Sequence, residues 1–271
     1  MASSMKKIII ITPLFLIINL AIAQVIPMEL TTDTSGFPDL RNRIKDQCFF
    51  IKMDSFNIDA YRKKAHYEYQ LGDYENCLKD LNKVMMLKPN SPDIYCNRGM
   101  CYVFMKKTKE AIRDLDEAIK LEPDVAVNYL NRAYAKSDAK DYKGSILDLN
   151  KAIAIKPDYA KAFFNRGASE EKLNQLKEAL QDYNKAIELN PFYLEAFFGR
   201  GALKYKLKDF KGAISDYDKV LKMAPDIESN DFYTYRGQAF EKLGDTLNSK
   251  LNYLKAATFK KTLFRVNTAN H

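Results

Sequence analysis

Proline recurs at intervals of 34 residues along most of this chain, and that period constrains the fold more than any other feature. The prolines are Pro89, Pro123, Pro157, Pro191 and Pro225. Arginine keeps the same interval at Arg98, Arg132, Arg166 and Arg200, and Arg236 follows after 36 residues. The longer last step indicates a two-residue insertion between Ile227 and Asp231. A fixed period of this length indicates stacked copies of one supersecondary unit.

Each period predicts two amphipathic helices separated by a short break. In the second period, one stripe of apolar and small residues includes Tyr95, Gly99 and Tyr102, and another runs from Ala111 to Leu121. Pro123 ends the second helix because proline lacks the backbone donor and clashes with the preceding turn. Small residues recur where the two helices must approach closely. They are Ala65, Gly99, Ala133, Gly167, Gly201 and Gly237 on first helices, and Cys77, Ala111, Ser145, Ala179, Ala213 and Ser249 on second helices.

The period, the paired small residues, Gly72-Asp73-Tyr74 between two helices and the terminal prolines resemble the tetratricopeptide repeat. An aromatic residue that this family often carries near the start of the first helix is matched by Tyr61, Tyr95, Tyr129, Phe163, Phe197 and Tyr233. The resemblance covers about residues 58 to 262, as six repeats. It implies an all-α fold, a right-handed α-solenoid of tandem antiparallel helix pairs, and protein binding as the general function.

The two ends of the repeat region depart from the period. In the last repeat Lys261 occupies the place of the proline, so we expect the second helix to continue towards Phe264 as a cap. The repeat domain is therefore expected over residues 58–264, followed by a tail at residues 265–271. Residues 24–57 lack the period, and their apolar stripe predicts a helix that covers the first repeat. A flexible leader at residues 24–37 before that helix is the alternative. The stripe consists of Leu40, Ile44, Cys48 and Ile51.

Residues 1–23 have the pattern of a signal peptide. Lys6 and Lys7 precede an apolar run from Ile8 to Ile18, and the small residues Ala21 and Ala23 stand before Gln24 as a cleavage site. The run is shorter than the roughly 20 residues that a membrane-spanning helix needs. We therefore expect an exported protein, periplasmic or secreted, with no membrane span after cleavage. An uncleaved N-terminal anchor is the alternative.

The chain has a formal net charge of +8, which falls to +6 (41 basic minus 35 acidic residues) once the first 23 residues and their two lysines are removed. This excess leaves open a second function, the binding of an anionic polymer or surface. Basic and acidic residues alternate, however, as in Lys79-Asp80 and Arg113-Asp114, which is typical of solvated helix faces. Export also disfavours nucleic acid as a partner.

The four cysteines are Cys48, Cys77, Cys96 and Cys101. An oxidising compartment permits disulfides. Cys96 and Cys101 lie five residues apart on one predicted helix and point to different faces, so they do not pair easily. Pairing of Cys77 with Cys101, or of Cys48 with either, is left open. The alternative is that the thiols are small core residues.

The arginines lie on the stripe that faces the core, where an unpaired guanidinium costs free energy. We predict that each pairs with an aspartate of the preceding repeat, because the first repeat has Lys64 in place of arginine and the sixth has Asn252 in place of aspartate. Pairing within one repeat, or exposure to water, is the alternative. This structural ladder consists of Asp80, Arg98, Asp114, Arg132, Asp148, Arg166, Asp182, Arg200, Asp216 and Arg236.

The resemblance implies that first helices line a concave groove, where we expect a peptide or protein segment to bind. Aromatic and apolar groups would seat its side chains, and a row of asparagines would bond its backbone. The alternative is that some of the aromatic residues pack between adjacent first helices. The candidates are Asn97, Met100, Phe104, Leu130, Asn131, Tyr134, Lys161, Phe164, Asn165, Phe198, Tyr205 and Tyr235.

The sequence contains no motif for catalysis, for a cofactor or for a metal. It has two histidines, His66 and His271, and no Gly-rich phosphate loop or nucleophile elbow. We therefore predict no catalytic residue, no cofactor and no metal. The expected function is that of an exported, non-enzymatic interaction scaffold in envelope or secretion-complex assembly.

Overall fold

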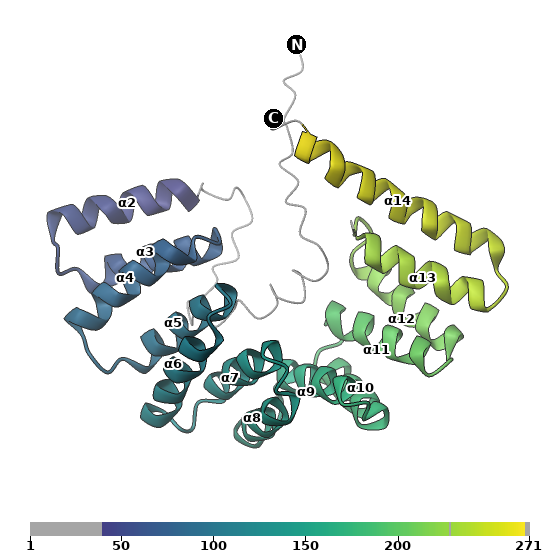
Figure 1. The fold of residues 1–271 in the computed structure, drawn as a ribbon, viewed down its shortest axis with the longest axis horizontal. Helices are drawn as coiled ribbons and strands as arrows, with labels where there is room; N and C mark the ends of the chain where they lie inside the picture. The colour runs from purple at the N-terminus through teal and green to yellow at the C-terminus, as the bar shows by residue number, and fades with distance from the viewer. Residues whose placement is uncertain (1–39, 228, 269–271) are drawn as a thin grey trace, which may run out of the picture. The chain divides into compact units, whose positions relative to one another are not determined.

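The computed structural model describes residues 40–227 and 229–268, with side chains up to residue 258. The predicted signal, residues 24–39 and residues 269–271 lie outside the described residues. The described residues form thirteen helices and no strand, and the predicted all-α solenoid of tandem helix pairs is confirmed (Figure 1). The helices are α2 (Leu40–Met53), α3 (Ile58–Gln70), α4 (Tyr74–Leu87), α5 (Pro92–Phe104), α6 (Thr108–Leu121), α7 (Ala126–Asp138), α8 (Tyr142–Ile155), α9 (Ala160–Lys172), α10 (Leu176–Leu189), α11 (Leu194–Lys206), α12 (Phe210–Met223), α13 (Asn230–Lys242) and α14 (Thr246–Thr268).

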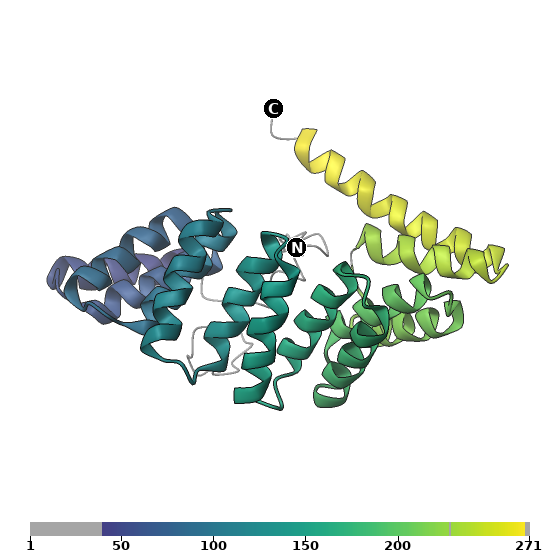
Figure 2. The same ribbon diagram turned by 60° about the horizontal axis from the view of Figure 1, so that its bottom comes forward.

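The helices divide into two compact units. The N-terminal unit contains α2 to α9, with the pairs α3/α4, α5/α6 and α7/α8, and the C-terminal unit contains α10 to α14, with the pairs α11/α12 and α13/α14. Within each unit every helix packs against the next (Figure 2). First helices also contact one another, α5 with α7, α7 with α9, and α11 with α13. Each unit therefore has a layer of first helices, which we call the first-helix layer.

The helix α2 precedes the first repeat and packs on α3. Leu40, Ile44, Cys48 and Ile51 are its half-buried side, and no residue of α2 is fully buried. At the other end α14 continues to Thr268, beyond the predicted end of the repeat domain.

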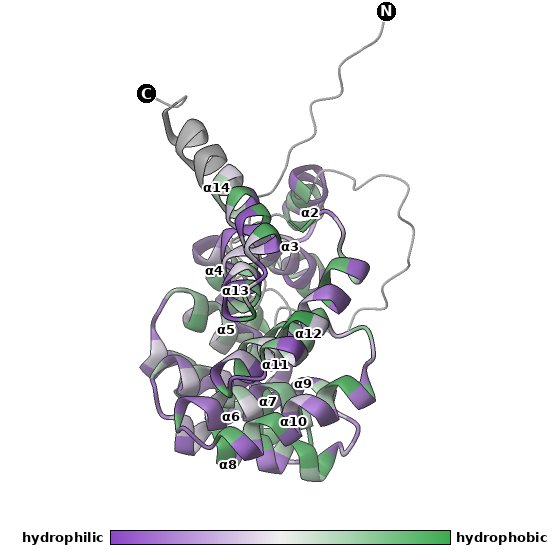
Figure 3. Cartoon of the chain, turned by 90° about the vertical axis from the view of Figure 1, so that its right-hand side faces the viewer, coloured by the Kyte–Doolittle hydropathy of each residue, from purple (hydrophilic) through white to green (hydrophobic). Residues whose placement is uncertain are grey.

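All twelve predicted small residues are buried, and the two helices pack together in the pairs α3/α4, α5/α6, α7/α8, α11/α12 and α13/α14. A Cβ atom added to Gly99 would lie 2.9 Å from Leu115, and one added to Gly201 would lie 2.7 Å from the Tyr217 ring. These separations are shorter than two carbon atoms normally allow, so a methyl group added at either position would force the facing side chain to move. The visible helices carry both hydrophobic and hydrophilic residues, as expected of amphipathic helices (Figure 3).

Breaks between the two helices of a repeat share one backbone geometry. A left-handed residue stands two positions before the second helix, for example Gly72 (φ 77°) and Lys140 (φ 65°). In four of the six breaks the next residue is an aspartate that caps the second helix; for example, the Asp141 carboxylate accepts a hydrogen bond from the Gly144 backbone N–H at 2.9 Å. Glycine suits the left-handed position best, as at Gly72, because only glycine adopts positive φ without steric cost.

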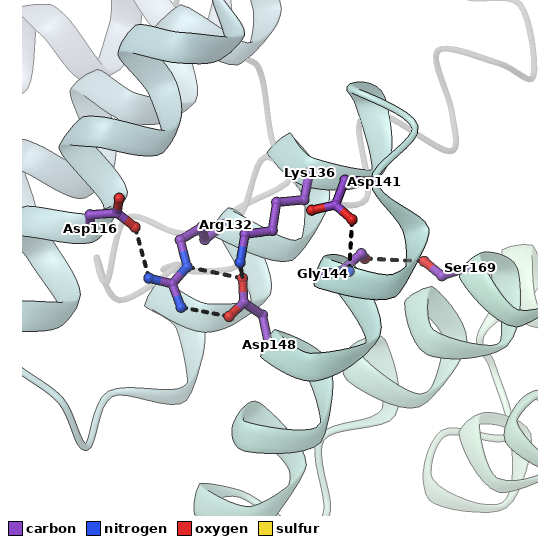
Figure 4. A network of polar contacts seen from close by, with 8 residues as sticks. Asp116, Arg132, Lys136, Asp141, Gly144, Asp148 and Ser169 are labelled. Atoms are coloured by element: carbon purple, nitrogen blue, oxygen red, sulfur yellow. Dashed lines mark hydrogen bonds and ion pairs between the residues drawn. The ribbon is translucent and has the colours of Figure 1, made fainter.

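The arginine ladder pairs within repeats, so the predicted register is wrong. Arg132 Nε and Nη2 donate to Asp148 Oδ2 and Oδ1 at 2.9 and 2.6 Å. Lys136 Nζ lies 2.7 Å from the same carboxylate, whose side chain is only 6% exposed (Figure 4). The predicted pairs Asp80–Arg98, Asp114–Arg132, Asp148–Arg166, Asp182–Arg200 and Asp216–Arg236 are replaced by pairs such as Arg98–Asp114, Arg132–Asp148 and Arg200–Asp216.

Lys64 and Asn252, the two residues that suggested the wrong register, occupy the arginine and aspartate positions of this same within-repeat pair. Lys64 Nζ binds Asp80 Oδ2 at 2.6 Å, as arginine does in later repeats. Arg236 Nη1 donates to Asn252 Oδ1 at 3.0 Å, where earlier repeats have aspartate. In each case the partner is 16 residues further along the chain, on the facing second helix of the same repeat.

The arginines also reach the preceding repeat, through residues that the sequence analysis missed. Arg132 Nη1 donates to Asp116 at 2.7 Å, and Arg200 Nη1 donates to Asn184 at 2.8 Å (Figure 4). Each of these acceptors stands two positions after a ladder aspartate. Their full set is Asn82, Asp116, Asn150, Asn184 and Asp218. Every ladder arginine therefore also contacts the preceding repeat, through a residue at a fixed position.

We expect Asp148→Asn to lower the free energy of unfolding by about 2 to 3 kcal/mol, because it leaves Arg132 and Lys136 without a buried counter-charge. The control is Asp116→Asn, which alters the other partner of Arg132 at a carboxylate that is 52% exposed. Exposed ion pairs contribute about 0 to 1 kcal/mol. Denaturant unfolding followed by circular dichroism measures both. Equal destabilisation by the two variants would contradict this assignment.

In the first repeat a second carboxylate joins the pair. Lys64 Nζ lies 2.9 Å from Glu68 as well as 2.6 Å from Asp80. Burial raises the pKa of Glu68 from 4.5 to about 7, and Lys64 only partly offsets this. The third and fifth repeats have Lys136 and Lys204 at the position of Glu68, where the lysine forms an ion pair with the aspartate. The first repeat thus holds two buried carboxyl groups for one lysine.

Stability should therefore fall as the pH rises from about 4.5 to about 7, since folded Glu68 keeps a proton that the unfolded chain releases. We expect Glu68→Gln to leave the unfolding midpoint nearly unchanged at pH 4. At pH 8 it should stabilise by on the order of 1 kcal/mol. Thermal unfolding at both pH values is the measurement, and an equal shift at both would rule out a titrating Glu68.

Candidate partner-binding surface

Seven of the twelve predicted groove residues keep exposed surface, and five are buried. Six are half-buried and retain some exposed surface, and Tyr235 is 41% exposed. The half-buried residues are Asn97, Phe104, Tyr134, Lys161, Asn165 and Tyr205. The structure places the other five in the core, so for them the alternative of packing between helices holds. They are Met100, Leu130, Asn131, Phe164 and Phe198, of which none is more than 8% exposed.

Asn131 shows why a residue at a predicted groove position can be inaccessible to a partner. Its Nδ2 donates to Cys96 Sγ at 3.1 Å, from α7 to α5, and its side chain is fully buried. Burial raises the pKa of Cys96 to about 12, so this thiol stays neutral. Asn131 therefore joins neighbouring first helices, and the predicted row of three accessible asparagines is interrupted in the middle.

Asn97 and Asn165 retain exposed surface on either side of that interruption. The side chain of Asn97 on α5 makes no hydrogen bond within the described residues. Asn165 on α9 donates from Nδ2 to the Lys161 carbonyl at 2.7 Å, which leaves its oxygen to accept. An amide that is half-exposed and unsatisfied can bond a peptide backbone without first breaking an internal contact.

The aromatic candidates are largely packed against other rings. Phe104 stacks on Tyr74 with centroids 5.1 Å apart and meets the edge of Tyr69 at 5.6 Å. Phe198 in the C-terminal unit lies 6.0 Å from Phe232 and 5.9 Å from Tyr235. Only the Tyr235 ring combines such a contact with substantial exposure, so it can present a flat apolar face to a partner.

Two ion pairs also lie on or next to the first helices. Arg62 on α3 forms an ion pair with Asp93 on α5. Lys106, after α5, forms one with Asp138 on α7 at 2.8 Å. Both pairs join neighbouring repeats and are partly exposed.

Within the described residues, no group of three or more histidine, cysteine or acidic side chains is arranged to hold a metal ion. None of the described helices is both long and apolar enough to cross a membrane.

Models of the tetratricopeptide repeat match residues 58–91, 92–125, 126–159, 160–193 and 194–227. These are five consecutive repeats, and the count of six stays a prediction. The pair α13/α14 nevertheless has the same local contacts, since Gly237 approaches Tyr253 and Arg236 binds Asn252. No curated protein sequence matches the chain.

Solved structures share the fold at low sequence identity. PilW, described as a widely conserved type IV pilus biogenesis factor, is 17% identical with a TM-score of 0.66, over 72% of this chain and 90% of that one. PilF of Pseudomonas aeruginosa is 18% identical with a TM-score of 0.63, over 77% and 91%. A chain of the APC/C hetero-tetramer Cut9–Hcn1 is 13% identical with a TM-score of 0.64, over 82% and 43%.

Identity at this level establishes the architecture alone, whereas the matched repeats extend without a gap over more than half of the sequence. The chain belongs to the tetratricopeptide repeat family.

Proposed function

We propose that this chain is an exported, non-enzymatic interaction scaffold that binds a peptide or protein segment on its first-helix layer. The main observation behind the proposal is that polar side chains on α5, α7 and α9 remain half-exposed, whereas the residues around them are buried. These side chains are Asn97, Tyr134, Lys161 and Asn165. Asn97 is the best placed, because its amide is unsatisfied within the described residues. In the C-terminal unit the exposed Tyr235 ring has the corresponding role.

The pairing of the buried aspartates with arginines supports a binding function over a catalytic one. The carboxylates of Asp114, Asp148 and Asp216 are each held by an arginine in two hydrogen bonds. Such groups hold helices together and are not free to accept or donate protons in a reaction. Binding on a preformed layer needs no further ordering of the scaffold, which lowers the cost of association.

Export is supported by the N-terminal pattern of Lys6 and Lys7, an apolar run and the small residues before Gln24. A role in envelope or secretion-complex assembly would suit an exported scaffold, and PilW, a pilus biogenesis factor, has the same fold. Binding of an anionic polymer through net charge is less well supported. Many cations of the first-helix layer, such as Arg98, Arg132 and Lys136, already have acidic partners.

Asn97→Ala should weaken binding of the partner segment about tenfold, because removal of one well-placed contact in an interface costs more than about 1 kcal/mol. The matched control is Gln181→Ala, which removes an exposed amide from the second helix α10. Partners captured from an envelope fraction are identified by mass spectrometry, and the isolated segment is titrated by calorimetry.

Two outcomes would contradict the binding proposal. One is equal affinity of wild type, Asn97→Ala and Gln181→Ala for the captured segment. The other is binding that has no saturable peptide target and weakens steeply with salt, which would favour the anionic polymer.

Export predicts that the mature protein begins at Gln24. Expression of the full chain, followed by cell fractionation and N-terminal sequencing, checks this directly. Ala23→Arg should block cleavage, since the position before the cut requires a small residue. Recovery of wild-type protein in the cytosol with residues 1–23 intact would refute export and leave the binding surface untouched.

A further inference from the structure

Two cysteines face one another in the contact between the first and second repeats. Cys77 lies on α4 and Cys101 on α5, and their Sγ atoms are 3.1 Å apart. Their side chains are 2% and 0% exposed, and both thiols are free in the structure. A disulfide bond is about 2.05 Å long, so a shift of about 1 Å would bring the sulfurs to bonding distance.

The same contact in later repeats shows that packing alone does not require thiols. Ser145 on α8 and Ser169 on α9 are also 24 residues apart, are both 1% exposed, and have Oγ atoms separated by 3.1 Å. Ala111 and Ala135 occupy the same two positions in between and are likewise buried. Pairs of cysteine, alanine or serine therefore all fit in this contact.

The remaining cysteines have other surroundings. Cys96 lies on a different face of α5 and accepts a hydrogen bond from Asn131. Cys48 is on α2 and is half-buried. Among the described residues, Cys77 and Cys101 are the pair whose sulfur atoms are within reach of each other.

We propose that Cys77 and Cys101 form a disulfide that covalently joins the first two repeats when the chain folds under oxidising conditions. Its formation in the cell rests on the proposed export, whereas the geometry of the pair does not. The site is a modification site of the scaffold and is separate from the partner-binding surface.

The oxidant is a disulfide of the compartment, either that of a dithiol oxidoreductase or oxidised glutathione. The Cys77 thiolate attacks one sulfur of that disulfide, which gives a mixed disulfide and expels the other sulfur as a thiolate. The Cys101 thiolate then attacks the Cys77 sulfur, and the second sulfur of the oxidant leaves. Two electrons pass to the oxidant, and the two protons of the cysteine thiols end on its thiols.

The bond is expected to close before the repeats pack fully. The hydrogen bond with Cys101 and burial raise the pKa of Cys77, so the folded thiol is a poor nucleophile. Tyr69 and Tyr74 pack against the cluster that contains both cysteines. Once formed, the disulfide is therefore shielded from reductants until the packing around it opens locally.

The test refolds the full chain in a buffer of reduced and oxidised glutathione, then blocks free thiols with iodoacetamide in denaturant, so that buried thiols also react, and maps tryptic peptides by mass spectrometry. Cleavage after Arg98 separates Cys96 from Cys101, so each linkage gives its own product. We expect a linked pair, residues 65–79 with 99–106, and alkylation of Cys48 and Cys96. We also expect reductant to lower the unfolding midpoint of the wild type.

The control is the double variant Cys77→Ser with Cys101→Ser, which copies the contact of Ser145 and Ser169. It should fold, and its midpoint should not respond to reductant. Introducing Ser145→Cys and Ser169→Cys into that background should restore a linked pair at the second site.

Four alkylated cysteines in folded wild-type protein would overturn the proposal, as would a linkage that involves Cys48 or Cys96. A linked pair in vitro together with a cytosolic chain that retains residues 1–23 would refute export and leave the disulfide site standing.

Discussion

The repeats depend on one guanidinium group that is shared between neighbours. Arginine carries five donors in a rigid fork, so Arg200 can bind both oxygens of Asp216 and still reach Asn184 in the preceding repeat. Lysine has no such fork. The first repeat, which has no predecessor, has Lys64 at this position. The aromatic residue three positions earlier supports the same group, since the Arg200 guanidinium carbon lies 5.4 Å from the centre of the Phe197 ring.

This coupling shapes the surface that is left for a partner. Because each arginine ties its own helix pair to the one before, the first helices are held against one another within each unit. Side chains between them, such as Asn131 and Leu130, are then covered by the neighbouring helix. What remains accessible is a sparse set of half-buried polar groups, with Asn97 the least satisfied. A binding surface of this kind would select its partner mainly by backbone hydrogen bonds and shape.

The period revealed the helices, their breaks and the small residues, because all of these recur at fixed positions along one repeat. It could not decide whether Arg98 pairs with Asp80, 18 residues before it, or with Asp114, 16 residues after it. Both aspartates lie on second helices that flank α5, and only the packing of the hairpin separates them. The period likewise placed Asn131 on the inner side of α7 without showing that α5 covers it.

A double-mutant cycle on Arg200 tests the shared guanidinium most directly. Arg200→Met is combined in turn with Asp216→Asn and with Asn184→Ala, and the unfolding free energies give two coupling energies. The account predicts a coupling of about 1 kcal/mol or more with Asp216 and a smaller, measurable one with Asn184. Coupling to Asp216 alone would mean that the arginine stabilises only its own repeat, and coupling to neither would contradict the account.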